Sequence, residues 1–152
     1  MNTPRTMLFR TVPEHDYLNF WPGSQFDPQH VVRFLELSKP DVAKIASVAP
    51  SSVRFDQKIP KDVLDRLMEI ANVCGLVAQF FQGDVAKTAL WFRTKNPLLG
   101  NISPRDMIRY GRYEKLRRFV MDALEENATV GGLQSVGFAQ GTGRGAAGAS
   151  AS

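Results

Sequence analysis

The fold is decided by residues 86–124, AKTALWFRTKNPLLGNISPRDMIRYGRYEKLRRFVMDAL, which predict three short helices joined by two compact turns. The first helix ends at Asn96-Pro97, because proline cannot donate a helical hydrogen bond and disfavours helical geometry in the residue before it. The second begins at Ser103-Pro104, since the serine oxygen can cap a helix and proline suits its first turn. Each turn therefore carries its own stop or start signal.

The third helix of this segment follows Gly111 and carries an apolar stripe. Side chains three and four residues apart lie on one face of a helix. The residues that share this face are Leu116, Phe119, Val120, Ala123 and Leu124. We therefore expect a helix with one buried face and one charged face.

The chain before residue 86 also reads as helical. Asp27 and Pro28 open one helix, and Ser38 with Asp41 three residues later has the pattern of a capping box that opens a second. A third short helix is expected to start near Pro50. Helical spacing is the main signal in each case.

A long helix is predicted from Pro60, with a wide apolar face that needs cover on more than one side. Its main stripe is Leu64, Leu67, Ala71, Cys74, Ala78 and Phe81. The cover can come from both halves of the chain or from a second subunit. The whole pattern predicts an all-α protein with few or no strands.

Composition limits the function classes. The chain has 152 residues, 43% of them hydrophobic, and a formal net charge of +4, which permits contact with nucleic acid without establishing it. Cys74 is its only cysteine, which excludes an internal disulfide or a thiolate zinc site. The amino-terminal residues lack the apolar run of a signal peptide, and we expect a cytoplasmic location and no membrane span.

No catalytic pattern stands out. The sequence shows neither a nucleophile beside a base, nor paired carboxylates in a pocket-forming context, nor the spacing of metal ligands. We therefore predict that the protein is not an enzyme and uses no cofactor, metal or small-molecule substrate.

The order of short motifs resembles the toxin-binding domain of the MbcA/ParS/Xre antitoxins. The pieces that carry the resemblance are Trp91-Phe92, Asn96-Pro97, Leu99-Gly100 and Ser103-Pro104, followed by a terminal amphipathic helix. They cover residues 86–124, and helix-turn-helix elements precede this domain in such antitoxins. The resemblance implies a cognate RES-domain toxin that consumes NAD or transfers ADP-ribose from it, and an antitoxin domain that covers the toxin's NAD cleft.

Residues 42–55, VAKIASVAPSSVRF, resemble the Xre-type helix-turn-helix, whose second helix enters the major groove. Ser47 stands where that motif usually has glycine, so we expect the left-handed turn residue to be missing. Hydroxyl, amide and cationic side chains suit phosphates and base edges. The candidate DNA-binding residues are Lys44, Ser51, Ser52, Arg54, Gln57 and Lys58.

The toxin-binding candidates combine cations that could sit where NAD phosphates otherwise bind with one aromatic anchor. They are Trp91, Arg93, Arg105, Arg109, Arg112 and Arg144. On a helical wheel Trp91 falls off the apolar face formed by Val85, Ala86, Ala89, Leu90 and Phe92. It is expected to pack beneath the turn at 96–102, and the alternative is an interface anchor.

Four regions are expected: an aromatic N-terminal arm at 1–26, an Xre-like helix-turn-helix region at 27–82, a toxin-binding domain at 83–127 and a flexible Gly/Ala/Ser tail at 128–152. The wide apolar face and the usual pairing of helix-turn-helix units predict a homodimer. The alternative function is a stand-alone helix-turn-helix repressor whose C-terminal domain dimerises.

Overall fold

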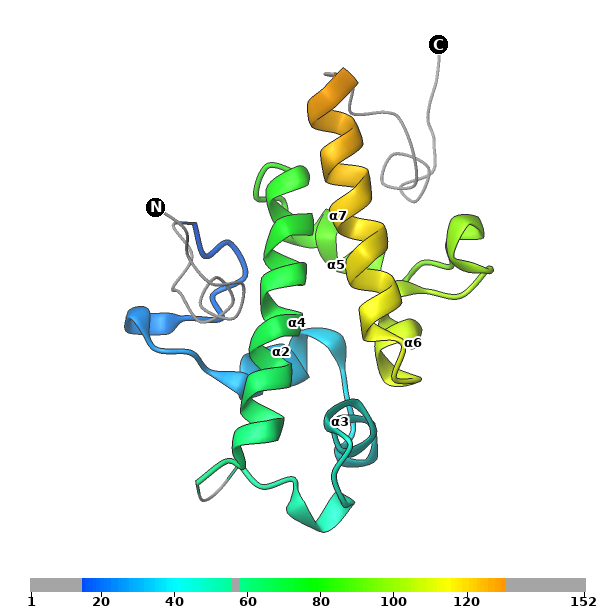
Figure 1. Cartoon of the computed structure of the whole chain (residues 1–152). Helices are drawn as coiled ribbons and strands as arrows, with labels where there is room; N and C mark the ends of the chain where they lie inside the picture. The colour runs from blue at the N-terminus through cyan, green and yellow to red at the C-terminus, as the bar shows by residue number, and fades with distance from the viewer. Residues whose placement is uncertain (1–14, 56–57, 131–152) are drawn as a thin grey trace, which may run out of the picture.

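The computed structural model describes residues 15–55 and 58–130, with side chains up to residue 126. Every named element in these ranges is a helix, which confirms the all-α prediction (Figure 1). They are η1 (Pro22–Ser24), α2 (Pro28–Leu35), α3 (Lys39–Ala46), η2 (Pro50–Ser52), α4 (Lys61–Phe80), α5 (Val85–Arg93), η3 (Pro97–Leu99), α6 (Pro104–Arg109) and α7 (Tyr113–Val130). No helix in the described ranges has both the length and the apolar character needed to cross a membrane.

The predicted capping residues begin the helices. The Asp27 carboxylate accepts from the Gln29 N–H at the start of α2. Ser38 and Asp41 form a reciprocal capping box at α3, as the sequence predicted. Ser103 accepts from the backbone N–H three residues later at α6. These caps satisfy N–H groups that have no partner inside the helix, which is why such short helices start where they do.

Helix α4 is the centre of the fold, and α2, α3, α5 and α7 all pack against it (Figure 1). Its side chains are buried along its length, including Val63, Leu67, Ile70, Cys74 and Val77. The wide apolar face predicted for this helix is therefore covered from both halves of the chain. The wide apolar face was one reason to expect a second subunit. Because helices of the same chain cover it, that reason no longer applies.

The core continues across the boundary expected between residues 82 and 83. Helix α2 packs on α5 and α3 packs on α6, so elements from both sides of the boundary touch directly. One hydrophobic cluster contains Val31 and Val42 from the first half together with Phe92 and Leu116 from the second. The turn at Gly83 joins two parts of a shared core.

The described part of the N-terminal arm covers the helical core with aromatic side chains. Phe20 and Trp21 are buried, and the Asp16 carboxylate accepts hydrogen bonds from both of their backbone N–H groups, at 2.9 Å and 2.7 Å. The Trp21 ring lies 5.0 Å from that of Phe26, centroid to centroid. The described part of the arm therefore packs against the helical core.

Two local expectations need correction. The short helix expected at Pro50 does begin there, but it is a single 3-10 turn of three residues, and Val53 after it is extended, so the backbone offers no recognition helix of ordinary length. Ser47 does adopt the left-handed conformation, with φ 59° and ψ 45°, although it is not glycine. The left-handed turn is therefore present and the helix after it is short.

The buried face of α5 also differs from the expected one. Thr88, Trp91 and Phe92 are buried, whereas Val85 and Leu90 are exposed. The Thr88 hydroxyl can enter the core because it donates to the Asp84 carbonyl at 2.8 Å. Hydrophobicity alone placed Val85 and Leu90 on the inner face in error, because a hydroxyl that bonds to its own helix backbone can be buried in their place.

Candidate functional site

The motif 96–102 forms a closed loop between α5 and α6. The Asn96 N–H donates to the Ile102 carbonyl at 3.1 Å, and the Asn96 side chain accepts from the Leu98 N–H at 2.9 Å. Gly100 has φ 79°, a left-handed conformation that favours glycine. Figure 1 shows this loop projecting from the helices beside α6. We call residues 94–103 the projecting loop.

The projecting loop has one buried and one exposed leucine. Leu99 is buried, whereas Leu98 next to it is 51% exposed at the tip. Leu90, on α5 just before the loop, is 55% exposed. Arg93 and Lys95 lie between these leucines in sequence and are also exposed. Apolar side chains and cations thus stand on the outside of the segment that carries the family resemblance.

The aromatic candidate Trp91 is not on the surface. It is 1% exposed, and its ring meets Phe92 in an edge-to-face contact at 5.1 Å. Its burial agrees with the packing role that the sequence favoured. The assignment of Trp91 as a direct toxin contact is wrong, because its side chain is buried and a partner could reach it only if the core opened.

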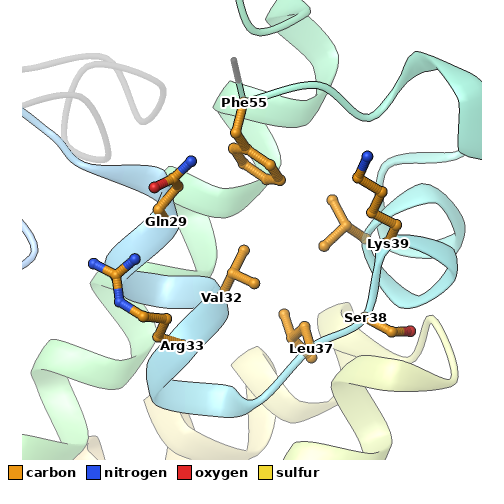
Figure 2. A pocket seen from close by; sticks show the side chains of 8 residues that line it. Gln29, Val32, Arg33, Leu37, Ser38, Lys39 and Phe55 are labelled. Carbon is orange, nitrogen blue, oxygen red and sulfur yellow. The ribbon is translucent and has the colours of Figure 1, made fainter.

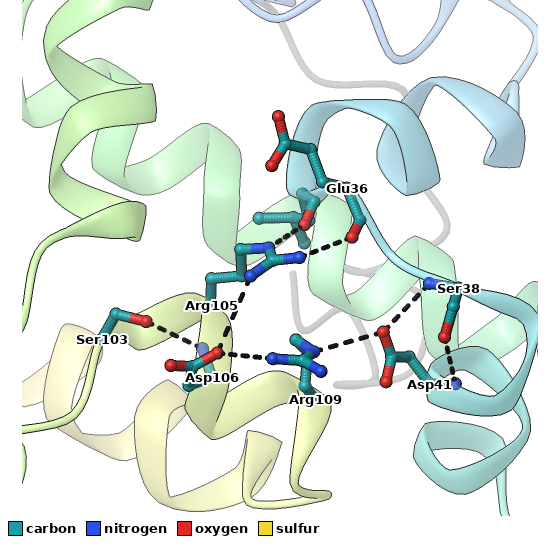
Figure 3. A network of polar contacts seen from close by, with 8 residues as sticks. Glu36, Ser38, Asp41, Ser103, Arg105, Asp106 and Arg109 are labelled. Carbon is teal, nitrogen blue, oxygen red and sulfur yellow. Dashed lines mark hydrogen bonds and ion pairs between the residues drawn. The ribbon is translucent and has the colours of Figure 1, made fainter.

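Three of the arginine candidates make contacts within the chain, and Figure 3 shows two of them, Arg105 and Arg109. Arg105 on α6 donates through Nε to the Leu35 carbonyl and through Nη2 to the Glu36 carbonyl at 2.6 Å. These are carbonyls at the C-terminal end of α2, where the helix has no internal donors left. Arg93 pairs with the Glu36 carboxylate at 3.0 Å. Both arginines tie the second half of the chain to α2.

Arg109 joins α6 to the start of α3. Its Nε lies 3.2 Å from Asp41 Oδ2 and its Nη1 lies 2.9 Å from Asp106 Oδ1. The hydrogen bonds that Arg109 donates to the two carboxylates, first to Asp106 and then to Asp41, raise the pKa of Arg109. The pKa of Asp41 is lowered: burial acts to raise it, but bonds from the N–H and hydroxyl of Ser38 and from Arg109 outweigh burial. The pair therefore stays charged at neutral pH.

The remaining toxin-binding candidates differ in position. Arg112 is exposed in the turn between α6 and α7. Arg144 lies outside the described residues. The contacts therefore leave Arg112 as the arginine best placed to meet a partner, while Arg105 and Arg109 hold the two halves of the fold together.

The candidate DNA-binding residues lie on and after α3. Lys44, Ser51, Arg54 and Lys58 are exposed and Ser52 is half-buried, while Gln57 lies outside the described residues. Lys44 lies on α3 before the turn at Ser47, Ser51 and Ser52 belong to η2, and Arg54 follows the extended Val53. The exposed candidates of this stretch are therefore presented on a 3-10 turn and the segment after it, not on a recognition helix of ordinary length.

One DNA-binding candidate and one toxin-binding candidate lie close together in the fold. The Lys44 side chain runs past the turn between α6 and α7, and its Cγ lies 3.9 Å from where a Cβ on Gly111 would stand. Arg112 is the next residue along that turn. A cation proposed to contact DNA and a cation proposed to contact a toxin are therefore neighbours, although they are far apart in sequence.

The single cysteine has no reactive character. Cys74 is fully buried on α4, and this burial raises the pKa of its thiol well above the ordinary range. In residues 15–55 and 58–130, no three His, Cys, Asp or Glu side chains are grouped as metal ligands would be. The features that do stand out are exposed apolar side chains and cations.

The exposure of the two leucines was not predicted from the sequence. Leu90 was expected on the buried face of α5, and Leu98 had no predicted role. The composition of α5 contains no signal that ranks Thr88 above Leu90 for burial, since hydrophobicity favours the opposite order. The exposed tip of the loop depends on how 96–102 closes, which needs three-dimensional contacts.

Comparison of this chain with protein-family models, with curated proteins and with solved structures gave no match.

Proposed function

We propose that this protein is the antitoxin of a type II toxin–antitoxin pair, that it neutralises a RES-domain toxin by covering its NAD cleft, and that it represses its own operon. The observation that carries the proposal is the projecting loop. The residues of the family-like motif close it through Asn96 and Gly100, and it holds Leu98 at an exposed tip. A loop closed by its own hydrogen bonds, with an apolar side chain at its tip, is the kind of element that serves as an anchor at protein interfaces.

Two exposed leucines near the projecting loop support a partner at this site. Among the described residues, the large hydrophobic side chains that are clearly exposed include five between positions 85 and 121 and one before the core. They are Val85, Leu90, Leu98, Tyr110, Met121 and, in the N-terminal segment, Tyr17. Single exposed apolar residues are common, but two leucines beside the same loop favour a protein contact.

The proposed contact set differs from the one expected from sequence. Leu90 and Leu98 supply apolar anchors, and Lys95 and Arg112 supply accessible cations. Arg105 and Arg109 act indirectly, by fixing α6 beneath the loop. A toxin surface with an apolar hollow and an acidic rim would fit, because charges at the edge of an interface mainly guide association and orientation.

The first test is whether a gene beside this one encodes a RES-domain toxin, and the second is calorimetry of that toxin with variants of this chain. Leu98→Asp should lower affinity for the toxin at least about tenfold, because it places a carboxylate in a desolvated apolar contact. Met121→Asp, at another exposed apolar position on α7, is the matched control and should bind as the wild type does. Equal binding by both variants, measured by calorimetry on folded proteins, would remove the loop from the toxin interface.

Autorepression rests on the exposed side chains around η2. Arg54→Ala should weaken binding to the operator by about 1–3 kcal/mol and reduce its preference over random DNA. Lys58→Ala should instead weaken binding to every DNA and lower its dependence on salt. If operator binding is strong while no toxin binds, the alternative function, a stand-alone helix-turn-helix repressor, replaces the antitoxin.

A homodimer remains part of this proposal because helix-turn-helix units usually read two half-sites. Light scattering of the purified chain, with and without operator DNA, decides whether it is formed in solution or only on DNA. A monomer bound to operator DNA at one copy per site would exclude the dimer.

A further inference from the structure

A pocket of about 250 Å³ lies between α2, the start of α3 and the segment after η2, on the first half of the chain. Figure 2 shows the side chains of Val32, Leu37 and Phe55 gathered around it, with Gln29 and Lys39 at its edge. Val42 completes the apolar lining, and Ser38 and Arg33 complete the rim. None of these residues belongs to the toxin-binding or DNA-binding candidates.

The size of the pocket decides what could fill it. Sites for cofactors and other small ligands usually occupy about 300–1,000 Å³ and enclose most of the ligand. This pocket is smaller than that range. Its volume suits one large side chain, such as leucine or phenylalanine, entering from a partner. Hot spots at protein interfaces commonly have this form, with one apolar anchor in a fitted pocket.

The charge of the side chains at the rim indicates which residues of the partner should flank that anchor. Both charged residues of the rim, Arg33 and Lys39, are cations, and both are exposed. In Figure 2 the Lys39 side chain rises beside the pocket, while Arg33 extends outward from α2. An anionic segment crossing this rim would meet two positive charges.

Among the described residues, two carboxylates near the pocket in sequence pair with cations that do not line it. Asp41 accepts from the Ser38 N–H at 3.0 Å and pairs with Arg109 on the far side of α3. Glu36 pairs with Arg93 at 3.0 Å. Asp27 caps α2 and lies 3.4 Å from His30 Nε2. Among the described residues that line the pocket, the charged side chains are Arg33 and Lys39, and both are positive.

We propose that this pocket is a second docking site, which binds an acidic segment of a partner protein through one leucine or phenylalanine anchor. The apolar lining formed by Val32, Leu37, Val42 and Phe55 holds the anchor, and Lys39 and Arg33 hold carboxylates on either side of it. The site is independent of the projecting loop, so it does not require the partner to be a toxin.

The probe is a synthetic peptide with one leucine flanked by aspartates and glutamates, titrated into the isotope-labelled full chain. Amide shifts should concentrate in residues 29–42 and at Phe55. A peptide with alanine in place of the leucine should lose most of the binding, and so should a peptide with lysines in place of the acids. Shifts spread over the surface, or equal binding by the lysine peptide, would overturn the proposal.

Two variants test the two halves of the site. Arg33→Glu combined with Lys39→Glu should weaken the acidic peptide about tenfold or more, because like charges now face each other across the rim. Val32→Glu should abolish anchoring by placing a charge in the lining. The control is Lys87→Glu, an exposed cation at the start of α5.

The double rim variant keeps the test independent of folding, because both side chains are exposed and their replacement leaves the core intact. Circular dichroism confirms that each variant is folded. Unchanged affinity in the double variant would overturn the proposal. A DNA duplex that displaces the peptide from the same amides would show that the rim is a phosphate contact and would also overturn it.

Discussion

At the scale of single residues, the arginines of α6 show that charge alone does not mark a binding surface. Arg105 and Arg109 belong to a strongly basic stretch, yet their guanidiniums bond to α2 and α3. Arg112 belongs to the same stretch and is exposed. Arg105 and Arg109 differ from Arg112 because hydrogen-bond acceptors lie within their reach. The sequence does not reveal this difference, because it does not give the distance in space between residue 105 and residue 36.

Arg105→Ala should destabilise the fold by about 1–3 kcal/mol, since it leaves two carbonyls at the end of α2 without a charged donor. Arg112→Ala removes the same side chain from an exposed position and should change stability by less than about 0.5 kcal/mol. Urea unfolding followed by circular dichroism measures both. Similar midpoints for the two variants would mean that the bonds of Arg105 contribute nothing to stability.

The lowered pKa of Asp41 predicts that its ion pair with Arg109, which links α3 and α6, is sensitive to acid. Because the folded protein binds this proton less tightly than the unfolded chain, the stabilisation is complete at pH values well above the ordinary pKa of 3.8. It is lost as the pH falls below that value through the folded pKa. Asp41→Asn should remove this part of the pH dependence and lower stability at neutral pH.

The measurement is the urea midpoint of wild type and Asp41→Asn from neutral to acidic pH. Asp62→Asn is the control, because Asp62 is an exposed acid in the first turn of α4. Parallel curves for wild type and Asp41→Asn would show that Asp41 does not couple folding to pH.

At the scale of elements, helix ends were predictable and helix faces less so. Asp27, Ser38 and Ser103 cap the helices that the sequence assigned to them, because capping depends on residues next to each other in the chain. The inner face of α5 depends on what packs against it, and Thr88 is tolerated there by a bond to its own backbone. The segment after Pro50 has helical starting residues but only one 3-10 turn.

A pair of glycines tests the local geometry of α4 and the turn after it. Gly83 has φ +84°, and a Cβ there would stand 2.8 Å from Cδ1 of Tyr17. Gly83→Ala should therefore destabilise the protein by roughly 1–3 kcal/mol through backbone strain, even if the tyrosine ring moves aside. Gly75→Ala, inside α4 with open space around the new methyl group, should stabilise it by about 0.5–1 kcal/mol. Thermal unfolding of both variants against wild type provides the measurement, and a stabilising Gly83→Ala would contradict the assigned turn.

At the scale of the whole molecule, the two expected regions on either side of residue 83 share a core. Val31, Val42, Phe92 and Leu116 belong to one cluster around α4. The sequence could give the order of elements and the apolar width of α4. It could not show which segments cover α4, because several amphipathic helices and a second subunit were equally suitable partners.

The shared core predicts a single cooperative unfolding transition, and the two tryptophans can report it separately. Trp21 lies in the N-terminal segment and Trp91 in α5, and both are buried. In Trp91→Phe and Trp21→Phe, the fluorescence of the remaining tryptophan should follow the same urea curve as far-UV circular dichroism. Two independent domains would instead give transitions with different midpoints for the two probes.

The central position of α4 has a further consequence during protein synthesis. The apolar sides of α4 are closed partly by α2 and α3, which are made before it, and partly by α5 and α7, which are made after it. At ribosomal speeds of about 5–20 residues per second, the nascent chain spends seconds with half of this helix uncovered. We expect the growing chain to be a substrate for chaperones until residues 113–124 have left the ribosome.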